Sequence, residues 1–158
     1  MTPTSVLIVD DHRVVGRGVR SYFESFPDIE VVAVAQSGEE ALRLLDDRLP
    51  AVVVMDLLMP GGIDGVEATR LVRARSPRTQ VVALTASTDE ARLLAVLRAG
   101  AIGYVRKDAD PEVLLAAVRA AARGQSVIDP AVAGTVLRDL AGRRVPGQEL
   151  TERELAVL

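Results

Sequence analysis

The chain has 158 residues, of which 49% are hydrophobic and 26% charged, a composition typical of a soluble globular domain. No apolar run is long enough to span a bilayer, the first residues lack the features of a signal peptide, and the absence of cysteine excludes disulfides and favours a cytoplasmic location. The net charge of −3 and the pI of about 5.2 argue against direct DNA binding by these residues.

Five short apolar segments alternate with stretches of helical spacing over the first 124 residues. The segments are 5–9, 31–35, 51–55, 81–84 and, more weakly, 102–105. Their apolar residues follow one another without alternation, which is typical of strands covered on both faces. The first two helical stretches, 12–26 and 39–49, each end before a proline. This alternation predicts five strand–helix repeats.

Capping patterns mark where the helices begin. A side chain that accepts a backbone hydrogen bond, followed three residues later by an acid, predicts a helix N-terminus. Proline in the first helical position and glycine after the last turn are further boundary signals. These signals are Ser37 with Glu40, Asp64 with Glu67, Ser87 with Glu90, Asp110 with Pro111, and the glycines Gly100 and Gly124.

The repeats predict an α/β fold of the flavodoxin-like (βα)5 type, a doubly wound parallel sheet with strand order 2-1-3-4-5. A closed eight-stranded barrel would need a much longer chain. We assign this domain to residues 4–125. Residues 126–149 are expected to form an extra C-terminal helix, over 129–140, and a linker.

Residues 150–158 contain another capping box, Thr151 with Glu154, which predicts the start of a further helix. The chain stops four residues after that box, and a helix so short is not stable alone. We therefore expect the chain to be a fragment that is cut at the first residues of a second domain.

Reactive side chains follow four of the predicted strands. Asp10 and Asp11 follow the first strand, Asp56 the third, Thr85 the fourth and Lys107 the fifth. In open α/β sheets the ligand site lies beyond the carboxyl ends of the strands, where the strand order reverses. We therefore expect these side chains to converge.

The chemistry of these side chains suits a site for a metal ion and a phosphoryl group. Two carboxylates ~4 Å apart repel by about 4 kcal/mol at an effective dielectric constant of 20, so a cation or a proton must compensate. Hard oxygen ligands with no histidine or cysteine nearby suit Mg²⁺. A carboxylate can also act as a nucleophile and form an aspartyl phosphate. Lys107 and Thr85 would then offer a positive charge and a hydroxyl group to phosphoryl oxygens.

The motifs resemble those of the receiver domains of two-component response regulators, over about residues 5–124. They are Val9-Asp10-Asp11, the stretch from Met55 to Pro60 followed by Asp64-Gly65, Leu84-Thr85-Ala86-Ser87, and Gly103-Tyr104-Val105-Arg106-Lys107. The segment Gly61-Gly62-Ile63 departs from the pattern, because it makes the loop before the third helix one residue longer than is usual. We expect that loop to leave the site itself unchanged.

The resemblance implies a role for each residue of the acidic cluster. Asp56 would be the phosphoacceptor. Asp11, Asp56 and the backbone carbonyl of Leu58 would bind Mg²⁺, and Asp10 would act mainly through metal-bound water. The domain would be a switch that assists its own phosphorylation and dephosphorylation, not a conventional enzyme.

The resemblance also implies the phosphoryl ligands and the switch. Thr85 and Lys107 would bind the phosphoryl group, and Tyr104 would turn inward when Thr85 moves. Leu58 and Ser87 would tune the lifetime of the phosphorylated state. On its own, Tyr104 would more simply be a half-buried packing residue.

The implied partners are a sensor histidine kinase, a second copy of the chain in a phosphorylation-dependent homodimer, and DNA. Residues 150–158 resemble the opening of a LuxR-type helix-turn-helix domain, as found in the NarL/FixJ class, so DNA binding would belong to a domain missing from this chain. No membrane partner is expected.

Two other functions fit the same fold. A Mg²⁺-dependent phosphohydrolase with an aspartyl intermediate usually has a second aspartate two residues after the nucleophile, where this chain has Leu58. A flavodoxin-like carrier needs a phosphate-binding loop after the first strand, where Asp10 and Asp11 would repel phosphate. His12, the sole histidine, is interpreted as solvent-exposed in preference to a metal ligand or phosphohistidine.

Overall fold

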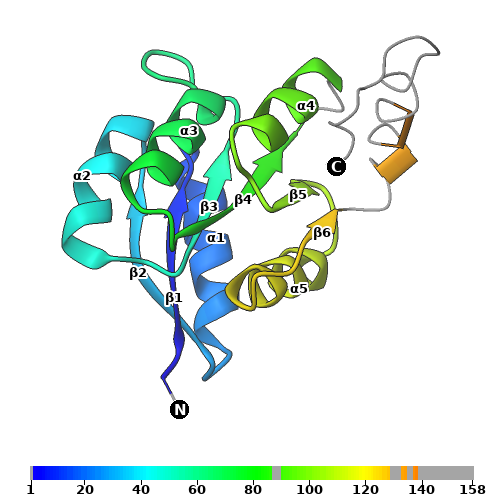
Figure 1. Ribbon diagram of the computed structural model, residues 1–158. Coiled ribbons are helices and arrows are strands. Elements are labelled where there is room, and N and C mark those ends of the chain that lie inside the picture. Colours follow the sequence, from blue (N-terminus) through cyan, green and yellow to red (C-terminus); the bar gives the residue numbers. More distant parts are fainter. Residues whose placement is uncertain (1, 87–89, 129–132, 135–136, 139–158) are drawn as a thin grey trace, which may run out of the picture.

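The strands form a single parallel sheet in the computed structural model, which describes residues 2–86, 90–128, 133–134 and 137–138. The order of the strands in the sheet is β2-β1-β3-β4-β5-β6 (Figure 1). The strands are β1 (Thr4–Val9), β2 (Ile29–Ala35), β3 (Val52–Asp56), β4 (Gln80–Thr85), β5 (Gly103–Arg106) and β6 (Val127–Ile128). The predicted flavodoxin-like fold and the order 2-1-3-4-5 are confirmed, with one strand added at the edge.

Five helices connect the strands and cover both faces of the sheet. They are α1 (Arg13–Glu24), α2 (Gly38–Arg48), α3 (Gly65–Arg75), α4 (Glu90–Arg98) and α5 (Pro111–Ala122). Helices α1 and α5 lie on one face, and α2, α3 and α4 lie on the other (Figure 1).

Two hydrophobic cores follow from this arrangement. Successive strand residues point to opposite faces. Leu7 and Val9 of β1 therefore belong to the core under α2, α3 and α4, whereas Val6 and Ile8 belong to the core under α1 and α5. Because both faces are covered, neither set can be polar, which explains the unbroken apolar runs in the sequence.

The predicted helix starts are borne out where the structure describes them. The Ser37 side chain accepts a hydrogen bond from the Glu40 backbone N–H at 3.0 Å, and Asp64 accepts one from Glu67 at 2.8 Å. Asp110 is the N-cap of α5, although its side chain makes no capping hydrogen bond to the described residues. The box at Ser87 lies outside the described residues.

The predicted helix ends are confirmed as well. Gly100 and Gly124 adopt φ values of +114° and +73°, a left-handed conformation that disfavours other residues. The exposed Leu49 adopts φ +46° at the end of α2.

The segment after α5 differs from the prediction. Residues 126–149 were expected to hold only a helix and a linker, yet Val127 and Ile128 form β6 and pair with Gly103 and Tyr104 of β5. Two residues are too few to produce a periodic signal in the sequence. Within the helix predicted over 129–140, residues 133–134 and 137–138 are helical, and the rest of 129–158 lies outside the described residues.

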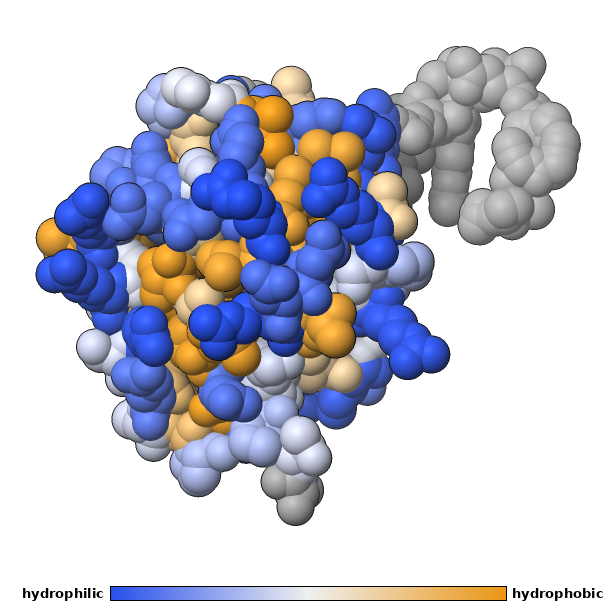
Figure 2. Space-filling model, turned by 90° about the vertical axis from the view of Figure 1, so that its left-hand side faces the viewer, coloured by the Kyte–Doolittle hydropathy of each residue, from blue (hydrophilic) through white to orange (hydrophobic). Residues whose placement is uncertain are grey.

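The surface carries few large exposed hydrophobic side chains. Val14, Leu49 and Leu137 are the most exposed of them in the described part of the chain. On the face shown in Figure 2, charged and polar side chains interrupt the hydrophobic areas. None of the described helices is long and apolar enough to cross a membrane.

Candidate functional site

The acidic, hydroxyl and lysine side chains predicted for the site lie at the carboxyl edge of the sheet. Asp10 directly follows β1, and Asp56 and Thr85 are the last residues of β3 and β4. The strand register brings Asp56 level with Leu84, and Thr85 level with Arg106, the residue before Lys107. Parallel strands therefore end at one level, which brings together side chains that are up to 97 positions apart in the sequence (from Asp10 to Lys107).

Lys107 joins the two buried carboxylates. Its Nζ lies 3.2 Å from Oδ2 of Asp10 and 3.1 Å from Oδ2 of Asp56. Asp10 and Asp56 are almost fully buried, with 1% and 0% of their surface exposed. One positive charge thus faces two negative charges in a place that water reaches poorly.

This excess of negative charge affects the pKa of Asp56. Burial, followed by repulsion from Asp10, raises the pKa of Asp56 from its ordinary value of 3.8 to about 6. The charge of Lys107 and the hydrogen bond that the Leu58 backbone N–H donates to Asp56 Oδ1, at 3.2 Å, oppose that rise. The negative charge of ionised Asp56 is therefore only partly neutralised, and a further cation would stabilise it.

The acidic group fits a divalent cation. One oxygen of each of Asp10, Asp11 and Asp56 and one ring nitrogen of His12 lie within 4.8 Å of one another. Ligands on opposite sides of Mg²⁺ are separated by about 4.2 Å, so rotamer adjustments suffice to close the site. Moreover, the buried Oδ2 atoms of Asp10 and Asp56 share the single ammonium group of Lys107, and Oδ1 of Asp11 faces Nδ1 of His12. Buried carboxylate oxygens that share one positive charge can accept a hard cation as a further partner.

His12 is exposed, as expected, but its ring does not point away from the site. The ring is 61% exposed, yet Nδ1 lies 3.2 Å from Asp10 Oδ1, 3.1 Å from Asp11 Oδ1 and 3.5 Å from Lys107 Nζ. The expected orientation toward solvent is thus wrong for this nitrogen. Sequence position alone does not specify the side-chain rotamer that decides this.

The residues assigned to the switch are deeply buried. Thr85 is fully buried, and its carbonyl oxygen accepts a hydrogen bond from the Lys107 backbone N–H at 2.6 Å. Tyr104 is also fully buried, within the core under α2, α3 and α4, and not half-buried as its packing interpretation suggested. Leu58 is 38% exposed beside the site. Ser87 lies outside the described residues.

The lengthened loop is attached to α2. The Ile63 backbone N–H donates a hydrogen bond to Glu39 Oε2 at 3.0 Å, and this bond lowers the pKa of Glu39. Sequence reasoning missed Glu39, because the contact joins residues 24 positions apart and follows no motif. The loop is thereby held to the first turn of α2.

Gly65 is a second residue that the sequence did not single out for packing. A Cβ atom built on Gly65 would lie 2.2 Å from the backbone oxygen of Asp56 and 2.6 Å from Cα of Leu57. The start of α3 therefore presses directly against the end of β3. The absence of a side chain at Gly65 allows this approach.

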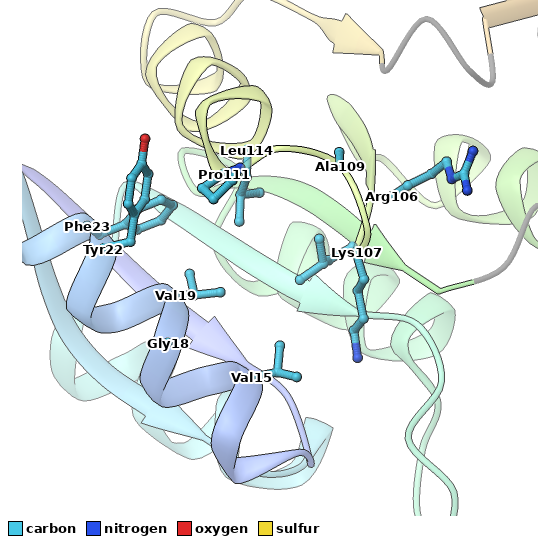
Figure 3. Close-up of a pocket in the computed structure, with 11 residues that line it drawn as sticks. Val15, Gly18, Val19, Tyr22, Phe23, Arg106, Lys107, Ala109, Pro111 and Leu114 are labelled. Atoms are coloured by element: carbon cyan, nitrogen blue, oxygen red, sulfur yellow. The ribbon is translucent and has the colours of Figure 1, made fainter.

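A cavity lies beside the site, between α1 and the segment that joins β5 to α5. Figure 3 shows Lys107 at one end of it and Tyr22 at the other. Its walls are largely apolar, with Val15 and Val19 contributed by α1 and Leu114 by α5. The phosphoryl-binding lysine candidate thus borders two compartments, the acidic site and this cavity.

Known proteins are similar to this chain in sequence and in fold. The profile of the response regulator receiver domain matches residues 6–119. The nitrate/nitrite response regulator protein NarP of Escherichia coli strain K12 is 41% identical over 160 residues, covering 99% of this chain and 74% of NarP.

Solved structures of response regulators are also similar to this chain. A two-component response regulator of the LuxR family from Aurantimonas sp. SI85-9A1 has a TM-score of 0.82 and 35% identity, covering 89% of this chain and 99% of that one. RcsB from Salmonella enterica serovar Typhimurium, bound to a promoter in the presence of the phosphomimetic BeF3⁻, has a TM-score of 0.80 and 27% identity, covering 89% and 70%.

The chain therefore belongs to the response regulator receiver domain family. The proteins that it resembles are two-component regulators of the LuxR and NarL type. The resemblance inferred from the motifs is confirmed.

Proposed function

We propose that the protein is a phosphorylation-activated switch in which Asp56 accepts a phosphoryl group from a sensor histidine kinase. The observation that carries this proposal is the state of Asp56, a buried carboxylate that Asp10 repels and that Lys107 only partly neutralises. Such a group gains from a bound cation, and its oxygen can attack phosphorus.

Asp11, Asp56 and the backbone carbonyl of Leu58 would hold Mg²⁺, with Asp10 acting through metal-bound water. The ion would neutralise negative charge on the acceptor and on the phosphoryl oxygens. In the transfer, an oxygen of Asp56 forms a bond to phosphorus while the bond from phosphorus to the donor's imidazole nitrogen breaks. Lys107 stands 3.1 Å from Asp56 and would bind a phosphoryl oxygen after transfer.

The signal would leave the site through Thr85 and Tyr104. Thr85 would donate its hydroxyl hydrogen to the phosphoryl group, and Tyr104 would follow within the core. Shifting a two-state equilibrium from 1:99 to 99:1 needs ~5.5 kcal/mol. Hydrogen bonds to charged groups contribute about 1.5–3 kcal/mol each, so about two to four of them suffice. Leu58 and Ser87 would tune how long this state lasts.

The output would be self-association and DNA binding. We propose a phosphorylation-dependent homodimer that acts on DNA through a helix-turn-helix domain of the type that residues 150–158 resemble. RcsB, which is similar in fold, binds a promoter in the presence of a phosphomimetic. Such a regulator works beside its kinase in the cytoplasm, where we propose this protein acts.

A switch is preferred over a phosphohydrolase for a reason at the site. The position two residues after Asp56, where an acid–base aspartate would be needed, is the apolar Leu58, 38% exposed. Nothing at this position can protonate a leaving group repeatedly. The domain would thus assist its own phosphorylation and dephosphorylation without turning over external substrates.

The acceptor assignment is tested by labelling with acetyl phosphate and Mg²⁺. Wild-type protein should gain one phosphoryl group by intact-protein mass spectrometry, and Asp56→Asn should gain none, because the amide is not a nucleophile. Asp108→Asn is the matched control, since Asp108 is an exposed carboxylate paired with Arg106. Full labelling of Asp56→Asn would refute the assignment.

A further inference from the structure

His12 places a nitrogen atom at the edge of the acidic site. We propose that His12 is a direct ligand of the bound cation when that cation is a borderline transition ion such as Zn²⁺, and that it makes the site bind such ions more tightly than Mg²⁺. This inference rests on the metal site of the proposed function.

The distances suit shared coordination. Nδ1 of His12 lies 3.1 Å from Asp11 Oδ1 and 3.2 Å from Asp10 Oδ1. Two neighbouring ligands, each ~2.1 Å from a metal, are separated by about 3.0 Å at the right angle of an octahedral site and by about 3.4 Å at the tetrahedral angle that Zn²⁺ prefers. The nitrogen and the Asp11 oxygen are therefore already spaced like neighbouring ligands of one ion. One oxygen of Asp56 lies within 4.8 Å of a ligand atom of each of these two residues.

Hydrogen bonds fix the backbone of His12 beside the acids. His12 is the N-cap residue of α1, with φ −91° and ψ 103°, and its carbonyl oxygen accepts the hydrogen bond of the Gly16 N–H at 3.0 Å. Its own N–H donates to Asp10 Oδ1 at 2.8 Å. Attachment at both ends of the residue leaves mainly the side-chain torsions free, so binding an ion needs little reorganisation.

The chemical nature of the ligand atom decides which ion binds more tightly. Mg²⁺ prefers oxygen ligands, whereas imidazole nitrogen suits Zn²⁺ and other late transition ions. Three buried or partly buried acids supply the oxygen atoms that either kind of ion can use. A nitrogen atom as the fourth ligand therefore raises the affinity for Zn²⁺ and leaves the affinity for Mg²⁺ nearly unchanged.

Calorimetric titration with the metal ions alone tests the proposal. Tag-free protein is used at about pH 8, because protons compete with metal ions for the ligand atoms. His12→Asn should bind Zn²⁺ at least about tenfold more weakly than wild type, and Mg²⁺ within about twofold. Val14→Ala, in the same turn and 84% exposed, should bind both ions like wild type. Equal Zn²⁺ affinity in wild type and His12→Asn, or tighter binding of both ions by the variant, would overturn the proposal.

Nuclear magnetic resonance gives a direct readout of the ligand. The chain contains one histidine and no cysteine, so imidazole ¹⁵N signals arise from His12 alone. Stoichiometric Zn²⁺ should shift the Nδ1 resonance, and an unshifted resonance in the Zn²⁺-bound protein would refute coordination.

The variant Asp11→Asn distinguishes failure of the metal site from failure of the role of His12, because it should weaken the binding of both Zn²⁺ and Mg²⁺. If Asp11→Asn binds Mg²⁺ like wild type, the proposed metal site itself fails. If only the effect of His12→Asn is absent, the role of His12 alone fails.

Discussion

The side chain of Asp56 lies at the end of a strand whose five residues are all buried. It shares Lys107 with Asp10, and the pKa of Asp56 rises to about 6 because burial and the neighbouring charge disfavour its ionised form. The same charge that prepares the site for a cation therefore destabilises the metal-free fold.

We predict that Asp56→Asn stabilises the metal-free protein at pH 7.5. Between pH values of about 4 and 6 the folded protein keeps a proton on Asp56 that the unfolded chain releases, so the wild type loses stability as the pH rises through this range. The variant avoids that loss, and its free energy of unfolding should exceed that of wild type by about 1–3 kcal/mol above pH 6.

Urea denaturation of both proteins at pH 4 and pH 7.5, with chelator present, measures the difference. The gain should be much smaller at pH 4, where Asp56 is protonated in the folded protein and partly protonated in the unfolded chain. A gain of equal size at both pH values would show that ionisation of Asp56 is not its cause.

At the scale of elements, the junction between β3 and α3 depends on close backbone contact. Gly65 begins α3 directly against the backbone of Asp56 and Leu57, and its N–H donates to the Leu57 carbonyl at 3.3 Å. The N-cap Asp64 starts the helix at this point. Any side chain at position 65 would push α3 away from the strand that carries Asp56.

We predict that Gly65→Ala lowers the free energy of unfolding by about 2–3 kcal/mol, because the added methyl group meets backbone atoms that cannot move aside. The matched control is Gly18→Ala in α1, where a Cβ atom meets nothing within 4 Å. That change should raise stability by about 0.5–1 kcal/mol, since alanine favours helix. Thermal and urea unfolding measure both, and equal effects of the two changes would contradict the packing argument.

At the scale of the whole molecule, the site lies where two separately packed layers meet. The sheet contributes to both cores, and the strand ends carry the charges that these cores cannot hold. Because the ligands of the proposed ion follow β1 and β3, binding links neighbouring strands and should favour the folded chain over the unfolded one.

We therefore predict that Mg²⁺ raises the unfolding temperature of the wild type. A ligand that binds only the folded state stabilises it by ~2.7 kcal/mol at a concentration one hundred times its Kd. Differential scanning calorimetry over a Mg²⁺ series should show a rise that Asp11→Asn largely abolishes. A rise of the same size in that variant would mean that the ion binds elsewhere.

Much of this molecule was determined by local sequence. Unbroken apolar runs indicated strands buried on both faces, and the caps at Ser37 and Asp64 marked helix starts, because burial and capping act over a few neighbouring residues. Since parallel strands end at one edge, the order of the elements was also enough to bring Asp10, Asp56 and Lys107 together.

Tertiary structure alone decided the features that depend on contacts between distant segments or on rotamers. The pairing of β6 with β5, the bond from Ile63 to Glu39 and the turn of His12 Nδ1 toward the acids are of this kind. Each involves a single contact or torsion, which leaves no periodic trace in the sequence, whereas strands and helices repeat their pattern over many residues.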